Sequence, residues 1–191
     1  EISHAIEQAK KQRNISISEF FTKNRHLLGF DNPLKAISTT IKEGVDNALD
    51  AAEDASILPD VIVEIKQTTP ERYIVTIEDN GPGIIKEQIP NIFGKLLYGS
   101  KFHKLSQTRG QQGIGISAAG LYGQLTTGKP VKITSKIGKN KPAYYYELHL
   151  DTTKNESEIA KEEIVEWDKD HGTKISIEME GKYQRGKRSV S

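Results

Sequence analysis

The sequence contains no cysteine, which excludes disulfide bonds and metal sites built from thiolates. It has no apolar run near the ~20 residues that a membrane-spanning helix requires, and its first residues lack the pattern of a secretory signal. Basic and acidic side chains number 27 and 26, so the bulk charge does not indicate a nucleic-acid partner. These absences favour a soluble, cytoplasmic protein without a membrane partner.

The residues that are present fit a single globular domain. The 191 residues are 35% hydrophobic and 28% charged, which is enough to form a sizeable core. We expect this domain over residues 16–181, where all the periodic segments lie. Residues 1–15 are polar and predict a short helix or an N-terminal arm, and residues 182–191 predict a basic tail at a domain boundary.

Two helix starts are marked by capping residues. Ser16 stands three residues before Glu19, the spacing of a capping box. Asn32 followed by Pro33 is a second start signal. Apolar side chains then recur at spacings of three and four as far as Ala55, which predicts one long helix with an apolar stripe formed by Ile37, Ile41, Val45, Ala48, Leu49 and Ala52.

The later part of the chain is rich in β-forming runs bounded by turn residues. A small-residue helix is expected over 116–122, and residues 94–115 are expected to form a long loop. This order predicts an α/β fold in which a mixed, mostly antiparallel sheet is layered against helices. The predicted strands are 61–65, 73–77, 131–137, 143–150 and 173–180, with a possible further strand at 163–167.

Glu43 and Asn47 lie four residues apart in the long helix, so their side chains should project from one face, opposite the apolar stripe. A carboxylate there could act as a general base on water, and an amide oxygen could bind a hard cation such as Mg²⁺. The alternative is an acidic, solvated helix face that also includes Asp46 and Asp50. The helix alone leaves both interpretations open.

Asp79 ends a predicted strand and is followed by Gly81 and Gly83. A strand-ending turn explains the Asn-Gly and Pro-Gly dipeptides on backbone grounds alone. A carboxylate at this point, with two glycines that clear space for a flat ligand, also suits a site that accepts a hydrogen bond from an exocyclic amine. The segment by itself does not decide between these interpretations.

Gly110, Gly113 and Gly115 precede the small-residue helix. Glycines at a helix N-terminus expose backbone N–H groups and suit the binding of phosphate. A dinucleotide-binding fingerprint is excluded, because no strand precedes these glycines and no acidic residue follows at the required distance. A P-loop is excluded as well, since Pro130 follows Lys129 where Ser or Thr is required.

The histidines predict no metal site. They are dispersed along the chain, and no pair has the spacing of metal ligands, so we expect surface positions for them. The five are His4, His26, His103, His149 and His171.

The order of the motifs resembles that of the GHKL ATPases, the family of gyrase B, mismatch-repair and heat-shock ATPases and histidine kinases. Glu-x-x-x-Asn on a helix precedes Asp-x-Gly-x-Gly after a strand, then Gly-x-x-Gly-x-Gly before a helix, then Gly172-Thr173 before a late strand. Within that family, residues 97–102, 109–119 and 180–186 are most similar to the B subunits of topoisomerase VI. The resemblance implies a Bergerat fold that holds ATP under a lid loop.

The resemblance also assigns roles to single residues. Glu43 would polarise the attacking water, and Asn47 would bind the Mg²⁺ that bridges the phosphates. Asp79 would accept a hydrogen bond from the adenine amino group, with support from Thr173 and with Gly81 and Gly83 beside the base. Ribose and phosphates would contact Ser100, Lys101 and the backbone of Gly110, Gln111, Gln112, Gly113, Ile114, Gly115, Ile116 and Ser117.

On the same resemblance, the whole enzyme would be an ATP-dependent DNA topoisomerase with a DNA-cleaving A subunit. ATP binding would exchange the N-terminal arm with a second copy and close a dimer gate during passage of duplex DNA, and hydrolysis would reset the gate. A lysine of a following transducer domain would reach the γ-phosphate. The sequence ends before such a domain, so we expect this chain to bind nucleotide but to hydrolyse it slowly.

Two other functions remain as alternatives. A histidine-kinase catalytic domain would share the fold, but a base such as Glu43 ahead of Asn47 favours transfer to water, and the sequence has no evident phosphoacceptor helix. A non-hydrolysing assembly module would keep the fold without turnover, and nucleotide would then fail to protect the chain against heat.

Overall fold

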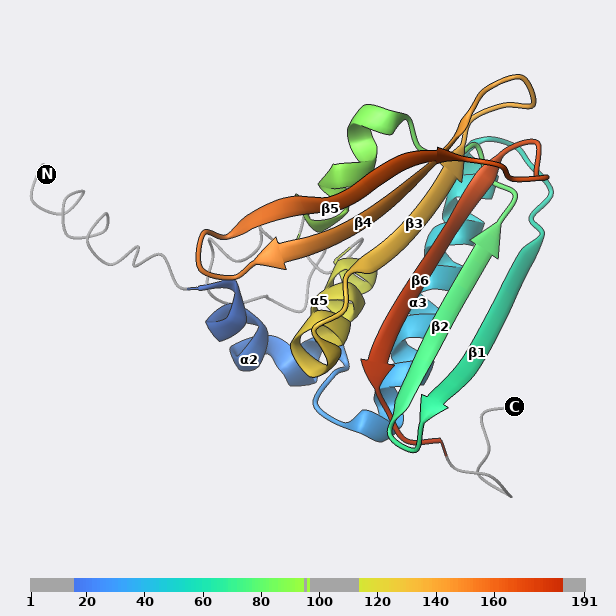
Figure 1. The fold of residues 1–191 in the computed structure, drawn as a ribbon. Helices are drawn as coiled ribbons and strands as arrows, with labels where there is room; N and C mark the ends of the chain where they lie inside the picture. The colour runs from blue at the N-terminus through green and yellow to red at the C-terminus, as the bar shows by residue number, and fades with distance from the viewer. Residues whose placement is uncertain (1–15, 95, 97–113, 184–191) are drawn as a thin grey trace, which may run out of the picture.

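The computed structural model describes residues 16–94, 96 and 114–183, which form a sheet layered against helices (Figure 1). The six strands of this part of the chain lie in the order β1-β2-β6-β3-β4-β5, and each neighbouring pair is antiparallel. The expected α/β layering is thus confirmed, with antiparallel pairing throughout these strands. They are β1 (Val61–Thr69), β2 (Arg72–Asp79), β3 (Val131–Lys136), β4 (Ala143–Asp151), β5 (Glu156–Val165) and β6 (Gly172–Glu180).

The described helices are α2 (Ile17–Leu28), α3 (Pro33–Asp54), the 3-10 helix η1 (Lys86–Phe93) and α5 (Gly115–Thr127). Both predicted helix starts are confirmed, because Ser16 Oγ accepts from Glu19 N at 3.1 Å and Asn32 Oδ1 accepts from Leu34 N at 2.9 Å. Helices α3 and α5 pack against each other, and they contact β2 and β6 respectively. Figure 1 shows α3 running along the far side of β2 and β6.

The core lies between the helices and one face of the sheet. On β2 the residues Tyr73, Val75 and Ile77 are buried and alternate with partly exposed neighbours, as expected for a strand with one covered face. The opposing face of α3 is built largely from small side chains, which lets the helix approach the sheet closely. Its buried residues are Ala36, Ile37, Thr40, Gly44, Ala48 and Ala52.

This buried face differs from the predicted apolar stripe. Leu49 is 42% exposed, while Gly44 and Thr40 are buried. Glu43 and Asn47 are half-buried and directly precede the buried Gly44 and Ala48, so they flank the core-facing side of the helix instead of lying opposite it. The periodicity located the helix correctly and identified the buried Ile37, Ala48 and Ala52, but it wrongly included Leu49 in the buried face.

Three further elements differ from expectation. Strand β5 runs over Glu156–Val165, whereas only a segment at 163–167 was expected. Helix α5 extends to Thr127, five residues beyond the predicted end. The 3-10 helix η1 was not predicted at all. The expected arm at 1–15, most of the expected loop (97–113) and residues 184–191 lie outside the described residues.

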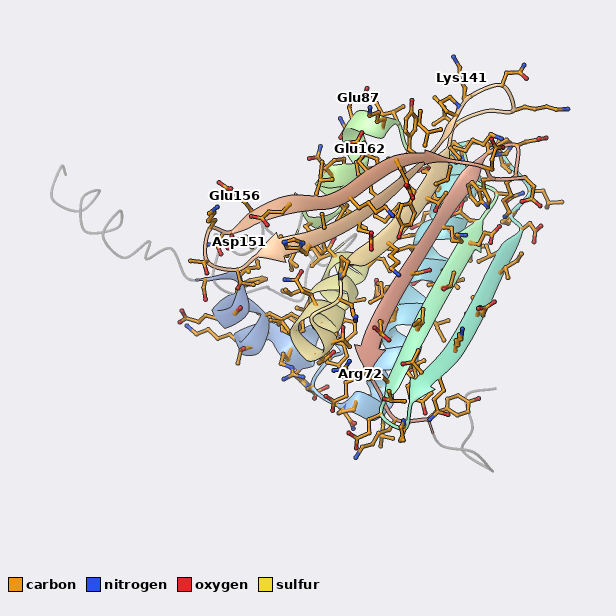
Figure 2. All side chains as sticks on the ribbon, viewed as in Figure 1. Arg72, Glu87, Lys141, Asp151, Glu156 and Glu162 are labelled. Atoms are coloured by element: carbon orange, nitrogen blue, oxygen red, sulfur yellow. The ribbon has the colours of Figure 1, made fainter. Side chains whose placement is uncertain are left out.

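Polar contacts hold η1 against the β4–β5 hairpin, where Figure 2 labels Glu162 close to η1. Lys86 Nζ lies 3.1 Å from Glu162 Oε1, which also accepts from the hydroxyl of Tyr146 at 2.9 Å. Ser157 Oγ donates to the carbonyl oxygen of Pro90 at 3.1 Å. These contacts fix η1 beside the cavity described next.

Candidate nucleotide site

A cavity of about 250 Å³ opens between α3, the sheet, η1 and the start of α5. Most of its lining is apolar, and Asn47, Asp79 and Thr173 supply polar side chains. A mainly apolar pocket with a few fixed polar groups is typical of a site for a small flat ligand. The lining residues are Gly44, Asn47, Ala48, Ala51, Ile77, Asp79, Pro82, Gly83, Ile84, Ile92, Ile116, Ile133, Thr173 and Ile175.

Asp79 is held by the backbone at the end of β2. Its Oδ1 accepts from Gly81 N at 2.8 Å and from Thr173 N at 3.1 Å. Within the described residues, its Oδ2 has no hydrogen-bond partner. Burial raises the pKa of Asp79, against the opposing effect of the two backbone N–H groups and of Lys169. A partly buried carboxylate with one engaged oxygen is suited to accept a hydrogen bond from a ligand amine.

Thr173 lies at the start of β6, and Ser135 of β3 supports it. The two hydroxyl oxygens are 3.0 Å apart, and Ser135 Oγ also accepts from Ile84 N at 2.8 Å and donates to Gly172 O at 3.1 Å. Ser135 is fully buried. The sequence did not single it out, because a lone serine within a strand carries no pattern.

The two glycines after Asp79 have different roles. Gly81 donates its N–H to Asp79 and faces Ala51 across the turn. Gly83 has a φ of +75°, and a Cβ there would overlap the carbonyl oxygen of Lys136. Gly83 lines the cavity. Its positive φ and the close approach of β3 at Lys136 leave no room for a side chain, so glycine is required there even without a ligand.

Glu43 and Asn47 extend the site along α3. Asn47 lines the cavity, and its amide has no hydrogen-bond partner among residues 16–94, 96 and 114–183. The carboxylate of Glu43 lies against Gly115, where an added Cβ would overlap it. Burial raises the pKa of Glu43, while Lys42 acts in the opposite direction. The neighbouring Asp46 is exposed and pairs with Lys42 at 2.6 Å, so it faces away from the site.

The first residues of α5 complete the described walls. Ile114 and Ile116 are buried, and Ile116 lines the cavity. The hydroxyl of Ser117 donates to the carbonyl oxygen of Ile92, so its side chain is already engaged within the protein. The other expected contacts to ribose and phosphate lie outside the described residues: Ser100, Lys101, Gly110, Gln111, Gln112 and Gly113.

Two side chains beside the site were missed. Lys169 Nζ donates to the carbonyl oxygen of Asp79 at 3.1 Å, and His171 Nδ1 lies 2.7 Å from the carbonyl oxygen of Gly81. His171, for which a surface position was expected, is therefore a half-buried neighbour of the site. No local pattern marked either residue, because each contact joins positions 90 residues apart in the sequence.

The described part of the chain contains no group of three or more His, Cys, Asp or Glu side chains that could hold a metal ion. None of its helices is both long and apolar enough to cross a membrane.

The chain is similar to known proteins over most of its length. Residues 33–188 match the family described as histidine kinase-, DNA gyrase B-, and HSP90-like ATPase. The chain is also similar to proteins named as the B subunit of type 2 DNA topoisomerase 6. It is 58% identical over 188 residues to that of Methanosarcina barkeri, covering 98% of the chain and 30% of the relative. With that of Natronomonas pharaonis it shares 61% identity over 177 residues, 93% of the chain and 22% of the relative.

The match covers nearly all of the chain but less than a third of either relative. The family model alone spans most of the chain and includes α3, β2, α5 and β6, the elements that form the cavity. The chain therefore belongs to the histidine kinase-, DNA gyrase B- and HSP90-like (GHKL) ATPases, and the domain it forms is a nucleotide-binding domain of that family.

Proposed function

We propose that this chain is the ATPase domain in the B subunit of a type 2 DNA topoisomerase 6, and that the cavity beside Asp79 binds the adenine of ATP. The observation that carries the proposal is the convergence of Asn47, Asp79 and Thr173, from three separate elements, on one apolar cavity. The names of the similar proteins support the topoisomerase assignment.

The base would lie between the apolar walls with its amino group at Asp79. Adenine presents a donor at its exocyclic amine, and Asp79 Oδ2 is an acceptor that no described residue engages. Burial disfavours the charged form of Asp79 and so raises its pKa. A ligand amine that donates to the carboxylate would stabilise this charged form. Thr173 would supply a further hydroxyl at the base, and Ser135 would hold that hydroxyl in place.

The phosphates would lie towards Asn47 and the start of α5. Asn47 fits a Mg²⁺ ligand, because its amide faces the cavity without a described partner, and Mg²⁺ commonly takes one or two protein ligands together with substrate phosphates. The cation would neutralise phosphate charge. Ser100, Lys101 and the backbone from Gly110 to Ser117 would contact ribose and phosphates.

Glu43 would act as the general base on the attacking water. Glu43 lies on α3, as Asn47 does, and its carboxylate reaches the N-terminal end of α5. The raised pKa makes the carboxylate a stronger base than an exposed glutamate, which suits proton abstraction near neutral pH.

In the whole protein, ATP binding would close a gate between two copies of the chain, with residues 1–15 exchanged between them. A DNA-cleaving A subunit and duplex DNA would be the other partners, in the cytoplasm. The similar proteins are named as subunits of a topoisomerase, which supports an assembly with a second kind of subunit.

Calorimetry with ATP and Mg²⁺ tests the proposal, using the chain and its Glu43→Gln variant. The wild type should bind ATP, and the variant should bind with similar affinity while hydrolysis falls by about 10²- to 10⁴-fold. Absence of ATP binding to the folded wild type would refute the proposal. Parallel loss of binding and hydrolysis in the variant would make Glu43 a structural residue.

A further inference from the structure

Two residues on the approach to β6, and a third within it, contact the turn that follows β2. Lys169 Nζ donates to Asp79 O at 3.1 Å, His171 Nδ1 lies 2.7 Å from Gly81 O, and Thr173 N donates to Asp79 Oδ1 at 3.1 Å. A carbonyl oxygen only accepts, so Nδ1 of His171 carries the proton in this contact. The two side chains thus hold both ends of the turn formed by residues 79–81.

Lys169 is fixed in place by a second contact. Its side chain is only 17% exposed, and its Nζ lies 3.4 Å from Oε1 of Glu78, which is 22% exposed. A lysine ammonium this far removed from water is stable only when polar partners satisfy it. The carbonyl of Asp79 and the carboxylate of Glu78 are those partners, and together they leave the ammonium little freedom.

The turn is held on its other side by a different segment. The side chain of Asn80 donates to Leu58 O at 3.0 Å and accepts from Asp60 N at 2.8 Å. Asn80 therefore anchors the turn to the segment before β1, while Lys169 and His171 anchor its two flanking carbonyls. The orientation of the Asp79 carboxylate depends on this turn, because one of its two backbone donors is the N–H of Gly81.

We propose that Lys169 and His171 are positioning residues for recognition of the nucleobase. By fixing the carbonyls of Asp79 and Gly81, they hold the Asp79 carboxylate where it accepts from the exocyclic amine of adenine. Neither side chain lines the cavity, so both act through Asp79. This inference rests on the proposed function. The orientation of the Asp79 carboxylate affects binding because hydrogen bonds weaken steeply when their geometry departs from linear.

The test compares two ligands that differ only in the amino group, ADP and purine riboside 5′-diphosphate. Their dissociation constants would be measured by calorimetry with the full 191-residue chain. Because the amine of ADP would donate to a charged acceptor, the wild type should bind ADP about 10- to 100-fold more tightly than purine riboside 5′-diphosphate. His171→Ala and Lys169→Met should each lower this ratio about 3- to 10-fold, with affinity for the amino-free ligand within about twofold of wild type.

Matched variants separate positioning from general damage. His171→Asn keeps an N–H donor near the position of Nδ1 and should restore most of the ratio. Glu78→Gln removes the charge of the ion pair but keeps an amide oxygen that can accept from Lys169, so it should retain the ratio. Lys141→Ala removes an exposed lysine from the β3–β4 turn, labelled in Figure 2, and should change nothing.

Each outcome is decisive. Equal loss of affinity for both ligands, or an unchanged ratio in both His171→Ala and Lys169→Met, overturns the inference while the proposed function stands. A wild type that does not discriminate between the ligands refutes the adenine role of Asp79 and the inference with it. If Lys169→Met fails to fold in a thermal scan, the His171→Ala and His171→Asn pair decides alone.

Discussion

Replacing Gly115 by alanine should displace Glu43 without altering Glu43 itself. A Cβ at Gly115 would overlap the carboxylate of Glu43 and also lie 2.5 Å from its Cγ, so a small terminal adjustment cannot relieve the clash. The side chain must adopt another rotamer. Because Glu43 is half-buried at the edge of the site, it has solvent to move into.

The stability change should be small because two effects oppose each other. Alanine in place of a helical glycine contributes up to about 1 kcal/mol of stability, and a strained rotamer of Glu43 costs about 0.5–1.5 kcal/mol. We therefore expect a change in the free energy of unfolding within about 1 kcal/mol. Hydrolysis should fall about 10²- to 10⁴-fold through loss of the positioned base, while ATP affinity changes less than about tenfold.

The assay combines urea unfolding, ATP calorimetry and phosphate release, with Gly138→Ala as the matched control. A Cβ at Gly138 would meet only Lys141 Cγ at 3.6 Å, an ordinary contact. The double variant Gly115→Ala/Glu43→Gln should hydrolyse no more slowly than Glu43→Gln alone, because both changes remove the same group. Full hydrolysis in Gly115→Ala, or additive losses in the double variant, would refute the reasoning.

Three further substitutions test the rest of the site. Asp79→Asn should weaken ADP binding at least about tenfold and should not destabilise the free chain at neutral pH. Because burial raises the folded-state pKa of Asp79 above 3.8, the wild type loses stability as pH rises from 3.8 through that raised value, and a urea-unfolding series should find this slope absent in the variant. Asn47→Ala should reduce the Mg²⁺ dependence of ATP affinity in calorimetry with and without the cation, and an unchanged dependence would remove Asn47 as a ligand. Gly172→Ala, at a φ of +143° and with a Cβ that would overlap Asp79 O, should cost about 1–3 kcal/mol in urea unfolding, and a change below about 0.5 kcal/mol would contradict the close contact.

The sequence predicted the elements of the site better than their surroundings. The four-residue spacing of Glu43 and Asn47 is a local property of a helix, and Asn32-Pro33 marked its start. Asp79 at a strand end followed by glycines is equally local. These patterns survive folding because they depend on backbone geometry within a few residues.

Strand β5 could not be predicted in full from its sequence. Glu156–Val165 contains four glutamates, and most of its residues are exposed. An edge strand with so little burial has no alternating apolar pattern to mark it. Its place is set by pairing with β4 over Ala143–Asp151, and that partner is recognised only once the sheet exists.

The same limit explains why Ser135, Lys169 and His171 were missed. Each acts through a contact with residues 37 to 90 positions away. No local spacing encodes such a contact. It follows from the register between strands, which a single sequence does not specify.

That register aligns the residues of the site. Strand β2 pairs with β6 so that Ile77 faces Ile175 and Glu78 faces Lys174. Continuing this antiparallel alignment by one residue brings Asp79 opposite Thr173, where the Thr173 N–H reaches Asp79 Oδ1. A slip of one residue would send the buried Ile177 to the outer face of the sheet. The hydrophobic core therefore sets the alignment of the two site residues, although they lie 94 positions apart and neither belongs to that core.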